Sequence, residues 1–292
     1  MSIVDEIKAS FKKGSALTKL IYINLAVFLA VKLTGVFIDL FQLNPGFYPV
    51  SWLSVTANFS ELIFRPWGLF TYMFVHEGFI HILFNLLWFY WFGQIFLNYF
   101  SNKKLVSLYI LGGLAGAILY IIAFNIFPIY NPSIPMIGAS AAVIAIVVAI
   151  SFYIPDHLIY LMFIGPVKLK YIALASILID LLSITSSNAG GHIAHLGGAL
   201  FGYIYITQIK RGRNITKGFD RFMDKIFSLF KPRPKIKVSY KNNSNYSDMD
   251  MQYNQSKAEK QKEIDRILDK IAQSGYDSLT KSEKEMLFKN SK

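Results

Sequence analysis

A serine at the start of an apolar run is the first feature of this sequence that suggests chemistry. Ser140 follows a proline-punctuated segment and Gly138, and the sequence after it is apolar through Ile150 apart from small residues. A helix that begins at Ser140 would place unpaired backbone N–H groups beside the hydroxyl, where they can stabilise an oxyanion. An isolated serine in this position is more often a simple helix cap. Whether Ser140 is a cap or a nucleophile depends on which other polar side chains lie close to it.

Three polar side chains lie in two other apolar segments. His81 and Asn85 are four residues apart, so they share one face of a helix expected from about 77 to 100. His195 lies near the start of a further apolar run, from 190 to about 209. Lipid offers such groups no partner, so they must face protein or water. Hydrogen bonding between packed helices and a functional role both account for them.

Composition predicts a polytopic helical membrane protein. The 292 residues are 53% hydrophobic and only 16% charged, and the apolar residues form runs of membrane-spanning length. An aromatic-rich segment, 41–75, is expected to be an ordered interfacial loop. Ser140 is expected below the surface, after a re-entrant segment, because its helix is too short to cross otherwise. The expected spans are 20–40, 77–100, 105–127, 140–153, 171–184 and 190–209.

The charge pattern sets the orientation. The net charge of +12 fits anionic lipid headgroups better than nucleic acid. Lysine and arginine gather in alternate loops, which predicts that both termini are cytoplasmic. Ser140, His81 and His195 then all lie roughly 5–10 Å below the outer surface, at 1.5 Å per helical residue.

Small residues predict that the fourth and sixth helices touch. Ala141, Ala145 and Ala149 form one stripe, and Ala194, Gly198 and Gly202 form the other. A serine and a histidine at one depth on touching helices are a minimal nucleophile and general base. His81, Asn85 and the Ser140 N–H could then serve the oxyanion. With no acidic residue expected beside His195, the prediction is a Ser-His dyad.

Other chemistries fit less well. His76-Glu77 and His81 resemble a zinc-protease helix, but the two histidines are five residues apart rather than four. His192 and His195 could share a metal, yet no carboxylate is expected beside them. An aspartyl pair from Asp39 and Asp180 is not expected either. No metal or cofactor is therefore predicted, and the absence of cysteine excludes thiol chemistry.

Over residues 18–210 the chain resembles the rhomboid family of intramembrane serine proteases. The motifs are His81-x-x-x-Asn85, Gly138-x-Ser140 and Ala194-His195-x-Gly197-Gly198-x-x-x-Gly202. The resemblance implies a six-helix bundle with a water-filled cavity open to the outer side. It also implies roles for five residues: Ser140 as nucleophile, His195 as base, His81 and Asn85 at the oxyanion, and Gly138 shaping the loop.

Three positions depart from the family pattern. Gly68 replaces the arginine that usually follows Trp67, although Arg65 is near. Ala141 follows the serine where glycine is frequent. Ile144 stands where an aromatic residue often lies beneath the histidine.

The predicted function is cleavage of single-span membrane proteins, in or near their helix, at the outer side of a bacterial cytoplasmic membrane. The alternative is a non-catalytic rhomboid-fold protein that binds or chaperones transmembrane helices. A solute transporter using His81 and Asp180 lacks the inverted repeat that would support it.

Four segments are predicted: a basic arm (1–19), the catalytic domain (20–210), an amphipathic basic helix with a polar linker (211–255) and a small helical tail (256–292). The arm and the basic helix are expected to contact anionic lipid headgroups, or a partner in the case of the helix. In the tail, Gly275 is expected to stop one helix, and Thr280-x-x-Glu283 to form a capping box that begins the next.

Overall fold

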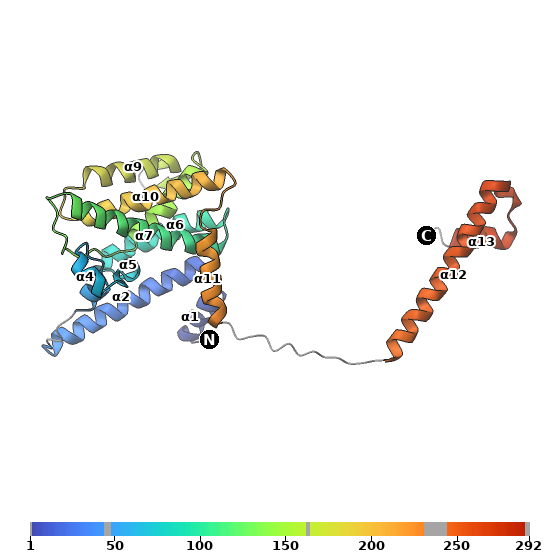
Figure 1. The fold of residues 1–292 in the computed structure, drawn as a ribbon, viewed down its shortest axis with the longest axis horizontal. Helices are drawn as coiled ribbons and strands as arrows, with labels where there is room; N and C mark the ends of the chain where they lie inside the picture. Colours follow the sequence, from blue (N-terminus) through green and yellow to red (C-terminus); the bar gives the residue numbers. More distant parts are fainter. Residues whose placement is uncertain (1, 44–47, 162–163, 231–243, 290–292) are drawn as a thin grey trace. The chain divides into compact units, whose positions relative to one another are not determined.

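The computed structural model describes residues 2–43, 48–161, 164–230 and 244–289, and these are mostly helical (Figure 1). They divide into two units, Met1–Lys231 and Pro232–Lys292. The first unit contains Ser140 and His195, and the second contains the predicted tail. The predicted helices of the first unit are present, with ends within about one turn of the expected positions.

Helix α8 (Ser140–Tyr153) is the centre of the first unit. Its side chains from Ala141 through Ser151 are all buried, as expected for a helix that is apolar on every side. It packs against α6 (Phe79–Leu97), α7 (Asn102–Ile126), α9 (Leu169–Leu182) and α10 (Ala189–Lys210). In Figure 1, α7, α10 and α9 run alongside one another.

The predicted contact between the fourth and sixth helices is confirmed. A Cβ on Gly198 would overlap the backbone carbonyl of Ala141, and one on Gly202 would overlap that of Ala145. The backbones of α8 and α10 are therefore in direct contact, as small residues permit. This contact positions the helix that carries His195 against the helix that begins at Ser140.

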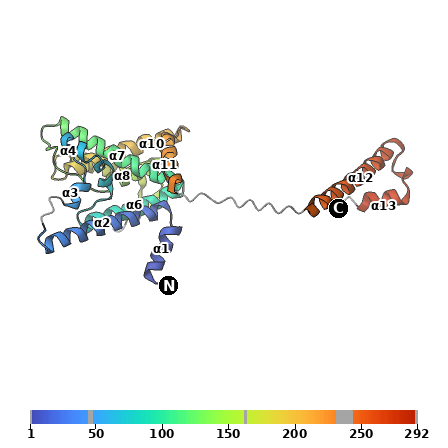
Figure 2. The same ribbon diagram turned by 60° about the horizontal axis from the view of Figure 1, so that its bottom comes forward.

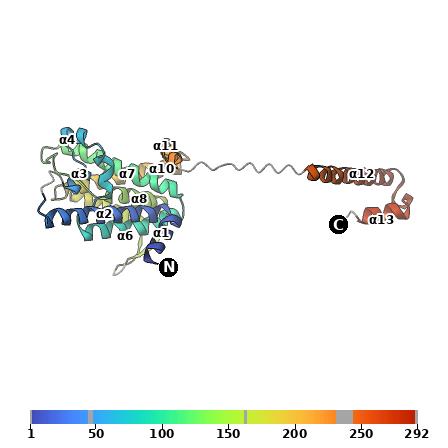
Figure 3. The same ribbon diagram turned by 90° about the horizontal axis from the view of Figure 1, so that it is seen from below.

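Helix α2 (Ala16–Leu40) lies along α6 (Figures 2 and 3). By length and composition, α2, α6 and α7 could each cross a membrane. Large apolar side chains on α2 are exposed, among them Leu33 and Leu40. Such a surface is stable where its solvent is apolar.

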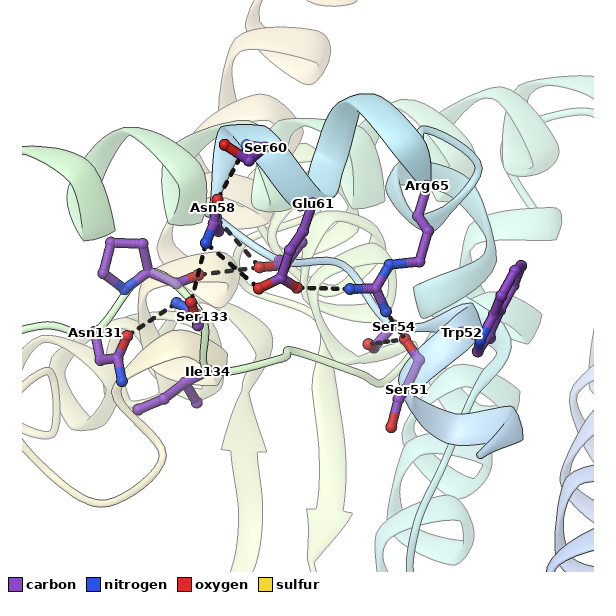
Figure 4. Close-up of polar contacts among 12 residues, drawn as sticks. Ser51, Trp52, Ser54, Asn58, Ser60, Glu61, Arg65, Asn131, Ser133 and Ile134 are labelled. Atoms are coloured by element: carbon purple, nitrogen blue, oxygen red, sulfur yellow. Dashed lines mark hydrogen bonds and ion pairs between the residues drawn. The ribbon is translucent and has the colours of Figure 1, made fainter. Parts of the chain in front are cut away.

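Segment 41–75 contains ordered structure. It forms α3 (Pro49–Leu53), α4 (Phe59–Phe64), α5 (Gly68–Thr71) and the 3-10 helix η1 (Tyr72–Phe74). Val55 and Met136 exchange backbone hydrogen bonds of 3.0 and 2.8 Å, and Asn58 Nδ2 donates to Ser133 Oγ at 3.1 Å (Figure 4). These bonds attach the first loop to the segment that leads into Ser140.

A β-hairpin between α8 and α9 was not predicted. Strands β1 (Leu158–Leu161) and β2 (Gly165–Lys168) pair antiparallel. Runs this short are ambiguous from sequence. Lys170 and Lys168 lie 2.8 and 2.9 Å from Asp156 and lower the pKa of its carboxyl to about 2.

The N-terminal arm forms the basic helix α1 (Ile3–Lys13). The predicted basic amphipathic helix is present after the bundle as α11 (Lys217–Phe230). Ser107 Oγ of α7 donates to Asp220 Oδ1 at 2.5 Å, and the carboxylate of Asp220 is buried. Lys103 pairs with Asp224. Polar contacts therefore attach α11 to the start of α7.

The tail is a helical pair, α12 (Ser244–Ser274) and α13 (Lys281–Lys289), joined through η2 (Tyr276–Ser278). The predicted polar linker was wrong from Ser244 on, where α12 begins; the part of it at 231–243 lies outside the described residues. Gly275 ends α12 at φ 76°. Glu283 Oε2 accepts from the Thr280 N–H at 2.7 Å and Thr280 Oγ1 from the Glu283 N–H at 3.4 Å, which confirms the capping box.

Acidification is expected to loosen the tail through Glu283. Bonds from the Thr280 N–H and from Lys270 lower the pKa of Glu283 to about 2, from an ordinary value of about 4.3. The capping contribution is then complete above about pH 4.3 and is lost as the pH falls toward 2. Amide exchange at 279–289 in the full-length protein, corrected for its intrinsic pH dependence, should accelerate over this range. In Glu283→Gln it should already be faster at pH 7, whereas Glu285→Gln, the same change on the same helix, should match the wild type. Equal protection in both variants would contradict the assignment.

Candidate active site

One cavity brings together the side chains singled out in the sequence. Ser140 from α8, His195 from α10, and His81 and Asn85 from α6 all line a space of about 670 Å³. A second cavity of about 270 Å³ shares Ser140, Asn85 and His195 and adds Asp180 of α9. The larger space can hold water as well as a peptide segment.

Ser140 is the first residue of α8, after an N-cap at Ala139. The N–H groups of a first helical turn have no partner within their own helix. The segment before Ser140 is anchored by the Gly138 N–H, which donates to the Tyr72 carbonyl at 2.9 Å. The Ser140 hydroxyl and the N–H groups of the first turn of α8 therefore occupy the same end of a buried helix.

Gly138 is required by conformation and by space. Its φ of +121° is one that L side chains rarely adopt. A Cβ there would lie 3.0 Å from both Cε1 and Nε2 of His81 and 3.6 Å from Ser140 Oγ. Glycine thus lets the His81 ring lie against the loop that precedes the serine.

Asn85 is nearly buried, and its Nδ2 donates to the His81 carbonyl at 2.9 Å. One further N–H of that amide remains for another acceptor. His81 and Asn85 therefore present donors at the cavity from one face of α6, the arrangement that their spacing predicted.

His76 is a site residue that the sequence analysis missed. It is fully buried, and its Nε2 accepts from the Ala139 N–H at 3.3 Å. Its ring meets that of His81 edge-on, with centroids 5.1 Å apart. His76 was considered only as a false zinc ligand, yet it holds both the residue before Ser140 and the ring of His81. The one indication in the sequence was that His76 lies only five residues before His81, close enough for the two side chains to meet.

The expectation that no acidic residue lies beside His195 was wrong. Oδ1 of Asp180 is 2.8 Å from Nδ1 of His195, and the Asp180 side chain is buried. Nδ1 of His192 lies at the same distance from that oxygen. Asp180 was left out because the orientation of α9 about its own axis could not be read from the sequence.

The same cluster corrects the statement that His192 and His195 have no carboxylate to complete a metal set. One ligand atom from each of Asp180, His192 and His195 lies within 4.8 Å of the others. Two histidines and a carboxylate can ligate zinc. The 2.8 Å separations, however, are those of imidazole N–H groups bonded to a carboxylate.

The first-loop residues have structural partners. Arg65 donates to the Ser51 carbonyl at 3.0 Å and pairs with Glu61 at 2.6 Å (Figure 4). Trp67 donates to the Trp52 carbonyl at 2.8 Å and stacks on the Trp52 ring. Neither Arg65 nor Trp67 is among the described residues that line the larger cavity. Arg65, three residues before Gly68, therefore stabilises the first loop through its bonds to Ser51 and Glu61.

Comparison with known proteins identifies the family. Residues 64–211, half of the chain, match the model of the rhomboid domain. The chain is 30% identical over 197 residues to RHOMBOID-like protein 12, mitochondrial, of Arabidopsis thaliana; the match covers 63% of this chain and 58% of the relative. This protein belongs to the rhomboid family. Residues 247–292 match a family of unknown function, DUF6576.

Proposed function

We propose that this protein is an intramembrane serine protease with a Ser140–His195 dyad. Its substrates are single-span membrane proteins, cleaved in or near the transmembrane helix at the outer side. The observation that carries the proposal is the single cavity lined by Ser140, His195 and the α6 pair His81 and Asn85. These are a nucleophile, a base and oxyanion donors from three helices, in a chain of the rhomboid family.

The proposed reaction is acyl transfer to serine followed by hydrolysis. His195 takes the Ser140 proton as Oγ attacks the peptide carbonyl carbon, and the oxyanion accepts bonds from the Ser140 N–H, His81 and Asn85. The C–N bond then breaks, and His195 returns its proton to the leaving amine. Water, activated by His195, attacks the acyl-enzyme and releases Ser140.

The proposal includes the setting of the site. We propose a multi-pass protein of a bacterial cytoplasmic membrane, with six spans and both termini cytoplasmic. The exposed apolar side chains of α2 and α9 and the lysines in alternate loops support this topology. The basic helices α1 and α11 would meet anionic headgroups.

Fluorophosphonate labelling tests the proposal. Only an activated serine attacks this reagent, so full-length protein in detergent should gain one adduct, located on Ser140 by mass spectrometry. His195→Ala should slow labelling strongly, because the hydroxyl loses its base. Folded protein that is never labelled and cleaves no transmembrane substrate would instead be a binder of membrane helices.

A further inference from the structure

A buried carboxylate holds His195 from the side of its ring opposite to Nε2. Asp180 is the third residue from the end of α9, is 5% exposed, and places Oδ1 2.8 Å from His195 Nδ1. The same oxygen is 2.8 Å from Nδ1 of His192. One carboxylate oxygen thus faces two imidazole nitrogens, from residues three apart on α10.

This contact selects the tautomer of His195. An ionised carboxylate only accepts hydrogen bonds, so Nδ1 must carry the proton and Nε2 keeps its lone pair. A general base needs that lone pair, because it receives the hydroxyl proton. In the opposite tautomer Nε2 is already protonated and cannot act as the base.

The surroundings explain how α9 accommodates a buried carboxylate. An aspartate in a mostly apolar helix is costly unless it is paired, and here two imidazole nitrogens each lie 2.8 Å from one oxygen of Asp180. Ile144, which stands where the family often has an aromatic residue, lines the smaller cavity together with Asp180 and His195. Besides the contact with Asp180, the ring of His195 meets the ring of His192 edge-on, with centroids 5.9 Å apart.

We infer that Asp180 is the positioning residue for His195, extending the dyad to a Ser140–His195–Asp180 triad, with His192 as the second donor that orients Asp180. This inference deepens the proposed protease function and depends on it for its catalytic consequence. The tautomer itself is independent of any activity.

The first test is a nuclear magnetic resonance measurement on full-length protein in detergent, labelled with 15N at histidine. The His195 signals, assigned by their loss in His195→Gln, should show a protonated Nδ1 with a strongly deshielded proton and an unprotonated Nε2. Asp180→Asn keeps the size of the side chain but offers an N–H, so the His195 proton should move to Nε2. Asp156→Asn, the same change at the exposed carboxylate beside Lys168 and Lys170, should leave the His195 signals unchanged. An unchanged tautomer in Asp180→Asn would overturn the inference.

The second test separates positioning from folding. Asp180→Asn should lower kcat about 10²- to 10⁴-fold while KM changes little, as in a serine protease triad whose histidine adopts the wrong tautomer. Asp180→Glu should recover part of kcat because it restores the acceptor, and His192→Gln should cost less than Asp180→Asn. If a raised KM or a lower thermal stability accounts for the whole loss of activity in Asp180→Asn, Asp180 serves folding alone. That result would overturn the inference.

Two further outcomes remain distinguishable. If wild type neither cleaves nor labels but shows the predicted tautomer, the proposed function fails and the positioning stands. If EDTA abolishes activity and Zn²⁺ restores it, the three side chains form a metal site, and the hydrogen-bonded triad is wrong.

Discussion

Ser140→Ala is expected to lower kcat for a model transmembrane substrate by about 10⁴- to 10⁶-fold, the range seen when a serine protease loses its nucleophile. Covalent catalysis divides amide hydrolysis into two easier steps, and both disappear with Oγ. The oxyanion donors and the cavity remain, so substrate binding should change little. The measurement is steady-state cleavage in detergent, at substrate concentrations above KM, where the rate reports kcat.

A matched control lies on the same helix. Ser151 is also a buried serine of α8, and its Oγ has no hydrogen-bond partner among the described residues. Ser151→Ala should therefore keep wild-type kcat, since it removes the same atom far from the cavity. Cleavage that survives in Ser140→Ala, or that is lost equally in both variants, would show that Ser140 is not the nucleophile.

Much of the candidate site could be predicted because its geometry follows from helical spacing. His81 and Asn85 share a face because they are four residues apart, and the start of α8 was read correctly at Ser140. The stripes of small residues indicated which helices touch, because only such residues allow backbone contact. These are local regularities that a single sequence displays.

Asp180 escaped prediction because its role depends on tertiary packing. The sequence indicated that Asp180 and His195 both lie toward the outer ends of their helices, so the two could share a depth. Which way α9 turns its faces depends on its packing against α8 and α10, and 14 mostly apolar residues give no strong amphipathic signal. His76 was missed for the same reason, since its acceptor role requires the Ala139 N–H of a distant loop.

The segments outside the bundle core were the least predictable. The hairpin of β1 and β2 is built from two four-residue strands, below the length at which periodicity distinguishes a strand from a loop. Helix α12 begins within a polar stretch that was read as linker, because few apolar residues mark its first turns. The tail's capping box, in contrast, is a local motif and was recognised.

Gly198→Val is expected to be the most damaging substitution for the folded state, since it acts where the two halves of the site meet. A Cβ at Gly198 would overlap the Ala141 carbonyl, with the Ala141 Cα at 3.2 Å. The obstacle is backbone in the fully buried helix, so it cannot rotate away, and α10 must move from α8. Overpacking of this kind costs roughly 3 kcal/mol, and His195 lies one turn earlier on the moving helix.

The measurement is thermal unfolding of the full-length protein in detergent, followed together with fluorophosphonate labelling. Gly35→Val is the matched control, because a Cβ on Gly35 would meet no other described atom within 4 Å apart from the adjacent backbone of α2, and it should unfold and label like wild type. Gly198→Val should unfold at a clearly lower temperature and label slowly even below that temperature, because movement of α10 displaces His195 from the cavity that it shares with Ser140. Normal stability with normal labelling would mean that α8 and α10 can separate without cost, and that the position of His195 does not depend on their contact.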